Sequence, residues 1–444
     1  MKTTLRIINV LRLALFPIGY GLTGALIGGT LNRIMIAELG FAATMVGIFF
    51  AIPLLVSPIR VWLGYRSDGF PIFGKRREPY IILGALVTGL GAIMAVALMV
   101  HGQPSSGSLI LGLLVAFVLF GFGRNLGHNT FQALLTEKFD EKARQRAITL
   151  YEVATLLGLV AGAGGLGSAL ENFEPARLLM VTIAVATIVL LLSIFAALAN
   201  EPRKEDLNAT AEKARKLPFT QVMREVVVGD RQVRLFFVLV LFTFIGTLAQ
   251  DVLLEPYGAL TLNMSVGDTT RLTAFWGVGV MISMLLSGII LLRWLGYMTL
   301  MRTGMITSIL VFIGVIASGA SGNAAMFNNL VLAMGLGTGL AGAGMLAGVV
   351  SFTTEIRAGL LMGVWGFANL LGRALGSVMG GAVVDIMQSV TNGNAFISYS
   401  VVFAIEILML LIALYLTTRL NVRESRAQVE AQGEIQLAAE GATG

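Results

Sequence analysis

The densest group of polar residues inside an apolar stretch lies between positions 124 and 132. It reads Arg124, Asn125, Leu126, Gly127, His128, Asn129, Thr130, Phe131, Gln132. On a helix, Arg124, His128 and Gln132 share one face, and Asn125 and Asn129 form the adjacent stripe. Polar side chains at membrane depth are costly, so this face is predicted to point into the protein or toward a bound partner.

A second group lies in a loop after the second apolar stretch. It reads Gly64, Tyr65, Arg66, Ser67, Asp68, Gly69, Phe70, Pro71, Ile72, Phe73, Gly74, Lys75, Arg76, Arg77. This loop resembles the major facilitator signature, with about three extra residues between Asp68 and Gly74. The resemblance implies that Asp68 accepts hydrogen bonds from the start of the eleventh helix, near Ala358, while the neighbouring cations brace it. The alternative is a basic loop that serves topology alone.

Few residues are available for enzymatic or metal chemistry. The chain has no cysteine and only two histidines, His101 and His128, which argues against disulfides, thiolate sites and a histidine-rich metal site. We therefore expect no enzymatic activity. Charged residues also fall inside apolar stretches, namely Arg124, Glu152, Asp251, Glu255, Arg373 and Glu406. The first apolar stretch carries only Glu38, at its outer end, which weakens the case for a proton-coupled transporter.

The overall composition excludes a water-soluble protein. Hydrophobic residues make up 56% of the 444 residues and charged residues only 13%, about half the share in soluble domains. The mean hydropathy is +0.84. These values predict a polytopic, all-α membrane protein.

Apolar stretches of about 20 residues predict twelve transmembrane helices. They lie near 13–37, 43–66, 80–100, 108–134, 146–169, 177–199, 234–260, 271–292, 297–318, 326–352, 358–384 and 396–418. The one long polar interruption, 200–233, holds 13 charged residues and divides the helices into two sets of six. We therefore predict two six-helix bundles, 1–199 and 234–420, a cytoplasmic linker at 200–233 and a cytoplasmic tail at 421–444.

The positions of lysine and arginine predict the orientation. With both termini in the cytoplasm, cytoplasmic ends and loops hold 26 of the 31 basic residues, whereas outside loops hold Arg33, Arg177 and Arg271. Such a bias predicts a multi-pass protein with its N- and C-termini inside. It also accounts for the net charge of +6 without a nucleic-acid partner.

Several stretches resemble the bacteriochlorophyll delivery (PucC/LhaA-like) family of the major facilitator superfamily. The most specific is the string Arg76, Arg77, Glu78, Pro79, Tyr80 at the entry to the third helix. Two others are Gly28 to Arg33, which closes the first helix, and Pro175 to Leu179, which opens the sixth. The resemblance extends over about residues 5–420 and implies the major facilitator fold.

This resemblance implies an assembly factor for a photosynthetic light-harvesting complex. The protein would handle bacteriochlorophyll, bound at most transiently, and deliver it to antenna subunits or to a reaction-centre antenna complex. Its location would be the inner membrane, either cytoplasmic or intracytoplasmic, in contact with membrane lipids. The alternative is a secondary transporter of the same superfamily that exports a small solute or a pigment precursor.

Candidate pigment contacts follow from the polar face of the fourth helix. His128 is the candidate axial ligand to a pigment magnesium, and Arg124 and Asn129 are candidate contacts to pigment oxygens or to the metal. The alternative is internal packing, with His128 hydrogen-bonded to Arg124 and Gln132 and with Arg124 paired to Glu152. No metal bound directly by the protein is expected. Candidate gating or structural residues are Asp68, Arg66, Lys75, Arg76, Arg77 and Glu152.

Overall fold

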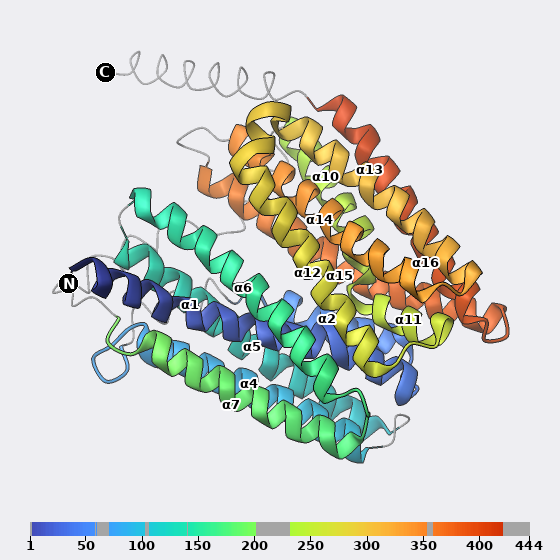
Figure 1. Ribbon diagram of the computed structural model, residues 1–444, viewed down its shortest axis with the longest axis horizontal. Helices are drawn as coiled ribbons and strands as arrows, with labels where there is room; N and C mark the ends of the chain where they lie inside the picture. Colours follow the sequence, from blue (N-terminus) through green and yellow to red (C-terminus); the bar gives the residue numbers. More distant parts are fainter. Residues whose placement is uncertain are drawn as a thin grey trace, which may run out of the picture.

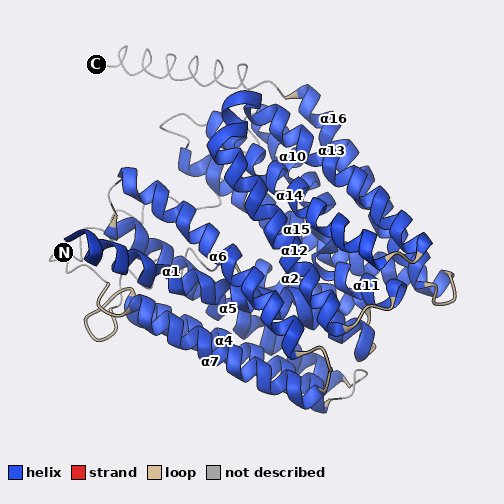
Figure 2. Ribbon diagram, viewed as in Figure 1, coloured by secondary structure: helices blue, strands red, loops and turns tan. Residues whose placement is uncertain are grey.

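The computed structural model describes residues 2–57, 59, 71–102, 106–139, 141–200, 231–352 and 358–420. Within them the secondary structure is helical, apart from one isolated bridge between Ile72 and Lys75 (Figure 2). The predicted all-α fold is confirmed. The predicted linker and tail fall largely on 201–230 and 421–444, outside the described residues, so the domain boundaries stay predictions.

The helices form two bundles that lie side by side (Figure 1). The first bundle contains α1 (Lys2–Leu26) continued by η1 (Ile27–Leu31) and η2 (Ile34–Glu38), α2 (Ala43–Leu55), α4 (Glu78–His101), α5 (Gly107–Lys138), α6 (Glu141–Ala169) and α7 (Pro175–Ala197). The second contains α10 (Arg231–Leu248), η3 (Ala249–Val252), α11 (Leu254–Leu262), α12 (Val266–Leu286) with η4 (Ser287–Leu291), α13 (Leu292–Ser321), α14 (Ala324–Phe352), α15 (Ala358–Val390) and α16 (Ala395–Arg419).

Twelve crossings account for these helices. In the part of the chain that is described, nine helices are long and apolar enough to cross a membrane, and one of them, Val266–Ser321, joins two crossings. The shorter apolar helices Ala43–Leu55 and Arg234–Leu248 complete the set. The protein is therefore a multi-pass integral membrane protein, as predicted.

The direction of the helices defines two ends of the molecule. Because the crossings alternate in direction, α1 begins and α16 ends at the same end, which we call the proximal end. The opposite end, where α2 and α12 begin, is the distal end.

The glycine-rich part of α6 packs against α1. A Cβ atom on Gly158 would lie 2.0 Å from the carbonyl oxygen of Ile18, so the two backbones meet at a distance that only glycine permits. Close backbone approach through small residues is a common way to pack membrane helices. Gly158 therefore serves the packing of α6 against α1.

The exterior of the first bundle is apolar, as lipid contact requires. On α7 the exposed large side chains are Met180, Ile183, Ile188, Leu191 and Phe195. Its buried face carries small or polar residues such as Thr182, Ser193 and Ala196. A helix of a water-soluble protein buries its apolar face and exposes its polar face. A membrane helix does not need this arrangement, because the lipid tails around it are as apolar as leucine.

The seventh crossing differs from the predicted single helix 234–260. It breaks at η3, between α10 and α11. Backbone groups freed by the break are bonded by neighbouring helices: Asn32 Nδ2 donates to the carbonyl oxygen of Val252 at 3.2 Å. The amide N–H of Gln250 donates to Glu406 Oε1 of α16 at 2.9 Å. Irregular backbone at membrane depth is stable only when protein surrounds it, which is the case here.

Candidate functional site

The polar face of α5 points into the first bundle, toward α1. The guanidinium carbon of Arg124 lies 3.6 Å from the centre of the Tyr20 ring. Arg124 Nη1 also donates to Thr23 Oγ1 at 2.7 Å and to the carbonyl oxygen of Tyr20 at 3.3 Å. A cation over an aromatic face away from water contributes about 2 kcal/mol. The charge is thus stabilised by a ring, a hydroxyl and a carbonyl.

His128 lies one turn further along α5, between α1 and α6. Its ring stacks on Tyr20 with centroids 5.0 Å apart. Its Nδ1 atom is hydrogen-bonded to the hydroxyl of Tyr151, whose ring meets the imidazole edge-on at 5.3 Å. The direction of that hydrogen bond depends on the imidazole tautomer. His128 therefore joins three helices, and the partner of its Nδ1 atom is Tyr151.

Aromatic packing closes the space around this cluster. The rings of Phe16 and Phe131 stack at 4.3 Å. The cavity beside Arg124 has a volume of about 20 Å³. It is lined by Phe16, Tyr20, Thr23, Gly84, Ala85, Thr88, Gly123, Arg124, Gly127, Val189 and Ser193. That volume accommodates about one water molecule, so a tetrapyrrole ring does not fit there in this conformation.

The prediction that His128, Arg124 and Asn129 contact pigment stays a prediction. Tyr20 covers one face of the His128 ring, and Tyr151 occupies its Nδ1 atom. A pigment that used this histidine would have to approach from another side. Asn129 is half-buried on the same turn of α5.

The neighbouring Asn125 ties α5 to α2. Its side-chain amide donates to the carbonyl oxygens of Gly121 at 2.8 Å and of Pro53 at 3.1 Å. Asn125 is 2% exposed, and a buried amide requires such partners. The stripe predicted to be adjacent to Arg124 and His128 therefore serves helix packing at this position.

Glu152 is not the partner of Arg124. Its side chain is exposed, although the residue lies inside α6. By helical period it shares a face with Leu159, Val160 and Gly167. Leu159 and Val160 border Gly277 of α12, and Gly167 borders Arg271. Glu152 thus lies on the side of α6 that faces the second bundle, whereas Arg124 points to α1, so the predicted ion pair does not form.

The loop before α4 is described only in part. Asp68 and Arg66 lie outside the described residues, so their predicted gating role stays a prediction. Lys75 forms an ion pair with Glu78 across the start of α4. Arg76 and Arg77 are each 4% exposed, and both are engaged in polar contacts. A buried guanidinium group needs such partners. Arg76 and Arg77 therefore take part in the packing of this region and are not simply positive charges on its surface.

A further cation closes α5 at the proximal end. Lys138 donates to both oxygens of Asn200, the backbone carbonyl oxygen at 3.4 Å and the side-chain Oδ1. Burial lowers the pKa of Lys138, and the nearby charge of Arg12 lowers it further, while Glu78 opposes the shift. This arrangement fixes the end of α5 against the end of α7.

Polar contacts join the two bundles at the distal end. Asn32 Nδ2 donates to Glu255 Oε2 at 2.7 Å, and Thr273 Oγ1 donates to Glu255 Oε1 at 2.8 Å. Glu255 is 4% exposed, so its carboxylate lies buried between α1 and the second bundle. The sequence identified Glu255 as a charge inside a crossing without giving it a partner.

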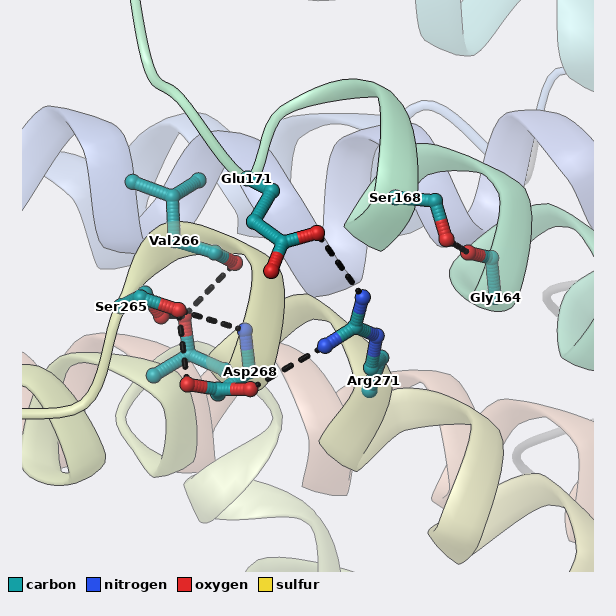
Figure 3. Close-up of polar contacts among 8 residues, drawn as sticks. Gly164, Ser168, Glu171, Ser265, Val266, Asp268 and Arg271 are labelled. Atoms are coloured by element: carbon teal, nitrogen blue, oxygen red, sulfur yellow. Dashed lines mark hydrogen bonds and ion pairs between the residues drawn. The ribbon is translucent and has the colours of Figure 1, made fainter.

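Two further distal contacts involve charged side chains. Arg271 of α12 reaches Glu171, in the turn between α6 and α7, at 3.5 Å and Asp268 at 3.2 Å (Figure 3). Asp385 of α15 accepts hydrogen bonds from the backbone N–H groups of Ala43 and Thr44, at the start of α2. Sequence analysis missed Asp385. The available signal was a helix that begins at Ala43 without a side-chain cap of its own.

Solved structures of low sequence identity share this fold. The chain superposes on a bacterial homologue of the human lysosomal transporter Spinster, in an inward-facing and unoccupied conformation, with a TM-score of 0.69. The match covers 96% of this chain and 98% of that one at 15% identity. The likeness establishes the fold alone, and it confirms the predicted major facilitator architecture.

Proteins related in sequence identify the family, which the solved structures do not. The chain is 31% identical to Protein PucC of Rhodobacter capsulatus, over 94% of this chain and 93% of that protein. It is 27% identical to the Bacteriochlorophyll synthase 44.5 kDa chain of the same species, over 96% of this chain and 98% of that protein. The profile of the family described as PUCC protein matches residues 30–425. The chain therefore belongs to the PucC family of membrane proteins.

Proposed function

We propose that the protein is a non-enzymatic assembly factor for a photosynthetic light-harvesting complex. It handles bacteriochlorophyll and delivers it to antenna subunits or to a reaction-centre antenna complex. The observation that carries this proposal is the family match over residues 30–425. The name of one relative, a bacteriochlorophyll synthase chain, supports the pigment as the cargo.

The fold is compatible with an apolar cargo that stays in the membrane. The cavity inside the first bundle, at about 20 Å³, is too small for a tetrapyrrole. We infer that pigment is handled on surfaces between the bundles or on their outer faces, and not in this cavity. Glu152, exposed on the side of α6 that faces α12, is a candidate polar contact there.

We place the protein in the inner photosynthetic membrane, with the proximal end in the cytoplasm. The distribution of basic residues supports this orientation, because 26 of 31 lie at the ends and loops that would then be cytoplasmic. Membrane lipids and antenna polypeptides are the proposed neighbours of its outer faces.

Secondary transport is the second candidate. It is favoured by one observation, the polar contacts that join the bundles at the distal end, as expected for a protein that opens at one end at a time. In this case the cargo would be a small solute or a pigment precursor that passes between the bundles.

An absorption spectrum separates the two candidates. The protein is purified in mild detergent from pigmented membranes, and a mock preparation from cells that lack the protein serves as the control for free pigment. A bacteriochlorophyll band that co-elutes with the protein supports the assembly factor. A colourless protein that binds or moves a small solute would overturn it in favour of transport.

A further inference from the structure

Helices α1, α4, α5 and α7 meet at the proximal end of the first bundle (Figure 1). One buried apolar cluster takes side chains from all four, among them Leu13 of α1, Ile81 of α4, Leu135 of α5 and Ala197 of α7. Arg12 directly precedes this cluster in α1, and Lys138 follows it in α5. Two cations from different helices therefore lie at the same edge of the cluster.

Neither of these cations is paired with a described carboxylate. Lys138 donates to the two oxygens of Asn200, which are uncharged. Within the described part of the chain, the buried Nε atom of Arg12 has no acceptor, and its guanidinium group forms no ion pair. The carboxylate of Glu78, at the start of α4, is paired with Lys75. An excess of positive charge therefore remains at this edge.

This excess of positive charge is costly where it lies. Burial and the charge of Arg12 both lower the pKa of Lys138, so the two cations are close enough to destabilise each other. A basic residue that only orients the chain in the membrane can stay in water, whereas Arg12 is half-buried. Because an unpaired, partly buried charge is unfavourable, the arrangement favours a bound group of negative charge.

The depth of the two cations indicates which anion fits. The first crossing begins at Leu11, and the crossing formed by α5 ends at Leu135, three residues before Lys138. Arg12 and Lys138 therefore lie at the edge of the apolar core, which is the depth of the lipid headgroups. The exposed side chains beside the site are apolar, namely Leu11 on α1 and Leu198 at the end of α7. A phospholipid offers both a negative charge and acyl chains.

We propose that Arg12 and Lys138 bind the phosphate group of an acidic phospholipid. Arg12 presents a planar guanidinium group that can donate to two phosphate oxygens, and Lys138, held by Asn200, supplies a second charge. The acyl chains lie against the apolar exterior formed by Leu11 and Leu198. The site lies away from the boundary between the bundles, and it does not depend on whether the protein is an assembly factor or a transporter.

Thermal unfolding in detergent tests this site, with phosphatidylglycerol as the probe and phosphatidylcholine as the uncharged comparison. A ligand that binds the folded protein raises its stability with increasing concentration, which gives an apparent affinity. We expect phosphatidylglycerol to stabilise the protein more than phosphatidylcholine does. In Arg12→Gln the affinity for phosphatidylglycerol should fall about tenfold, as for the loss of a hydrogen bond between charged groups.

The same variant separates a ligand site from a structural role. Without added lipid, Arg12→Gln should be at least as stable as the parent protein, because an unpaired charge is removed. An arginine that serves packing would instead give a less stable variant with and without lipid, which would contradict the proposal. Arg12→Lys keeps the charge and should lose less affinity than Arg12→Gln does.

Arg234→Gln is the matched control. Arg234 is exposed at the start of α10, at the same end of the molecule, so the variant removes an equal charge from another place. Its affinity for phosphatidylglycerol should equal that of the parent protein. Lys138→Gln retains a donor for Asn200 and should weaken binding as Arg12→Gln does, so the test remains decisive if Arg12→Gln fails to fold.

Inorganic phosphate distinguishes a free anion from a lipid. At matched ionic strength, phosphate alone should stabilise the protein no more than chloride does. Stabilisation by phosphate that equals the effect of phosphatidylglycerol would overturn the assignment to a lipid. Unchanged affinity in both Arg12→Gln and Lys138→Gln, or an equal loss in Arg234→Gln, would overturn the site itself.

Discussion

At the scale of single residues, aromatic rings hold the polar groups inside the first bundle. Tyr20 contacts both Arg124 and His128, so one side chain of α1 serves two polar side chains of α5. Tyrosine suits this position because its aromatic ring is apolar, yet the face of the ring attracts a cation or stacks on another ring. The charge of the half-buried Arg124 is thereby accommodated by a ring, a hydroxyl and a carbonyl oxygen.

The role of His128 can be tested by His128→Leu. The change removes the hydrogen bond to Tyr151 and the stacking on Tyr20, so we expect a loss of about 1–3 kcal/mol in the free energy of unfolding. If His128 is also an axial ligand to pigment magnesium, the purified variant loses or shifts the long-wavelength absorption band.

Tyr151→Phe is the matched control for that experiment. It removes the same hydrogen bond and leaves the imidazole in place. Equal spectra in the two variants, with pigment retained and the band unshifted, would show that His128 serves packing alone.

Asp68→Asn tests the loop that was predicted to brace the proximal ends of helices two and eleven. The substitution keeps the shape and removes the charge, so we expect lower antenna levels or a loss of about 1–3 kcal/mol in stability, as for a charge-assisted hydrogen bond. The measurements are the antenna spectrum of whole membranes and thermal unfolding in detergent. Wild-type values in both would mean that the loop serves topology alone.

Contacts of single residues were harder to predict than their positions. The polar face of α5 was evident from its spacing, but the partner of Arg124 was not, because a ring and a hydroxyl satisfy a guanidinium as well as a carboxylate does. Asp385 was missed for a related reason. An aspartate near the end of a helix is unremarkable until the start of another helix, more than 300 residues away, is placed beside it.

At the scale of the helices, hydropathy predicted the crossings to within a few residues at most ends. For example, the predicted helix 80–100 is observed as Glu78–His101, and 358–384 as Ala358–Val390. The break in the seventh crossing was not predictable from local sequence. It depends on Asn32 and Glu406, which come from the first and last crossings and bond the freed backbone groups.

The contact between α1 and α6 gives a helix-scale prediction. In Gly158→Ala the new Cβ atom would lie 2.0 Å from the carbonyl oxygen of Ile18, so the helices must separate. We expect a loss of about 1–3 kcal/mol from overpacking. The measurement is thermal unfolding in detergent.

Gly164→Ala, in the same helix, has nothing within 4 Å of the added atom and serves as the control. It should be neutral or slightly stabilising, because alanine favours a helix more than glycine does. Equal melting temperatures for the two variants would contradict the close approach of α1 and α6.

At the scale of the whole molecule, the orientation in the membrane is open to a direct test. Single cysteines at positions 210 and 440, in a chain that has none of its own, should react with a membrane-impermeant reagent only after the cytoplasmic side is exposed. Labelling of either position from the periplasmic side of intact cells would contradict the predicted topology.

Deletion in the native host tests the function of the whole protein. We expect a lower level of a light-harvesting complex with the capacity for bacteriochlorophyll synthesis unchanged, since an assembly factor acts after the pigment is made. Membrane absorption and total extracted pigment are the two measurements. Normal antenna spectra together with altered sensitivity to a toxic solute would favour the transporter.

The break in the seventh crossing also has a consequence for biogenesis. Glu406 belongs to α16, which lies 156 residues after Gln250 in the chain, and it accepts the hydrogen bond of the Gln250 amide. Until α16 is made, this amide lacks its acceptor, and the short apolar helix Arg234–Leu248 is below the usual length of a membrane helix. The seventh crossing therefore reaches its final form only once α16 has been made, so the second bundle matures as a unit and not helix by helix.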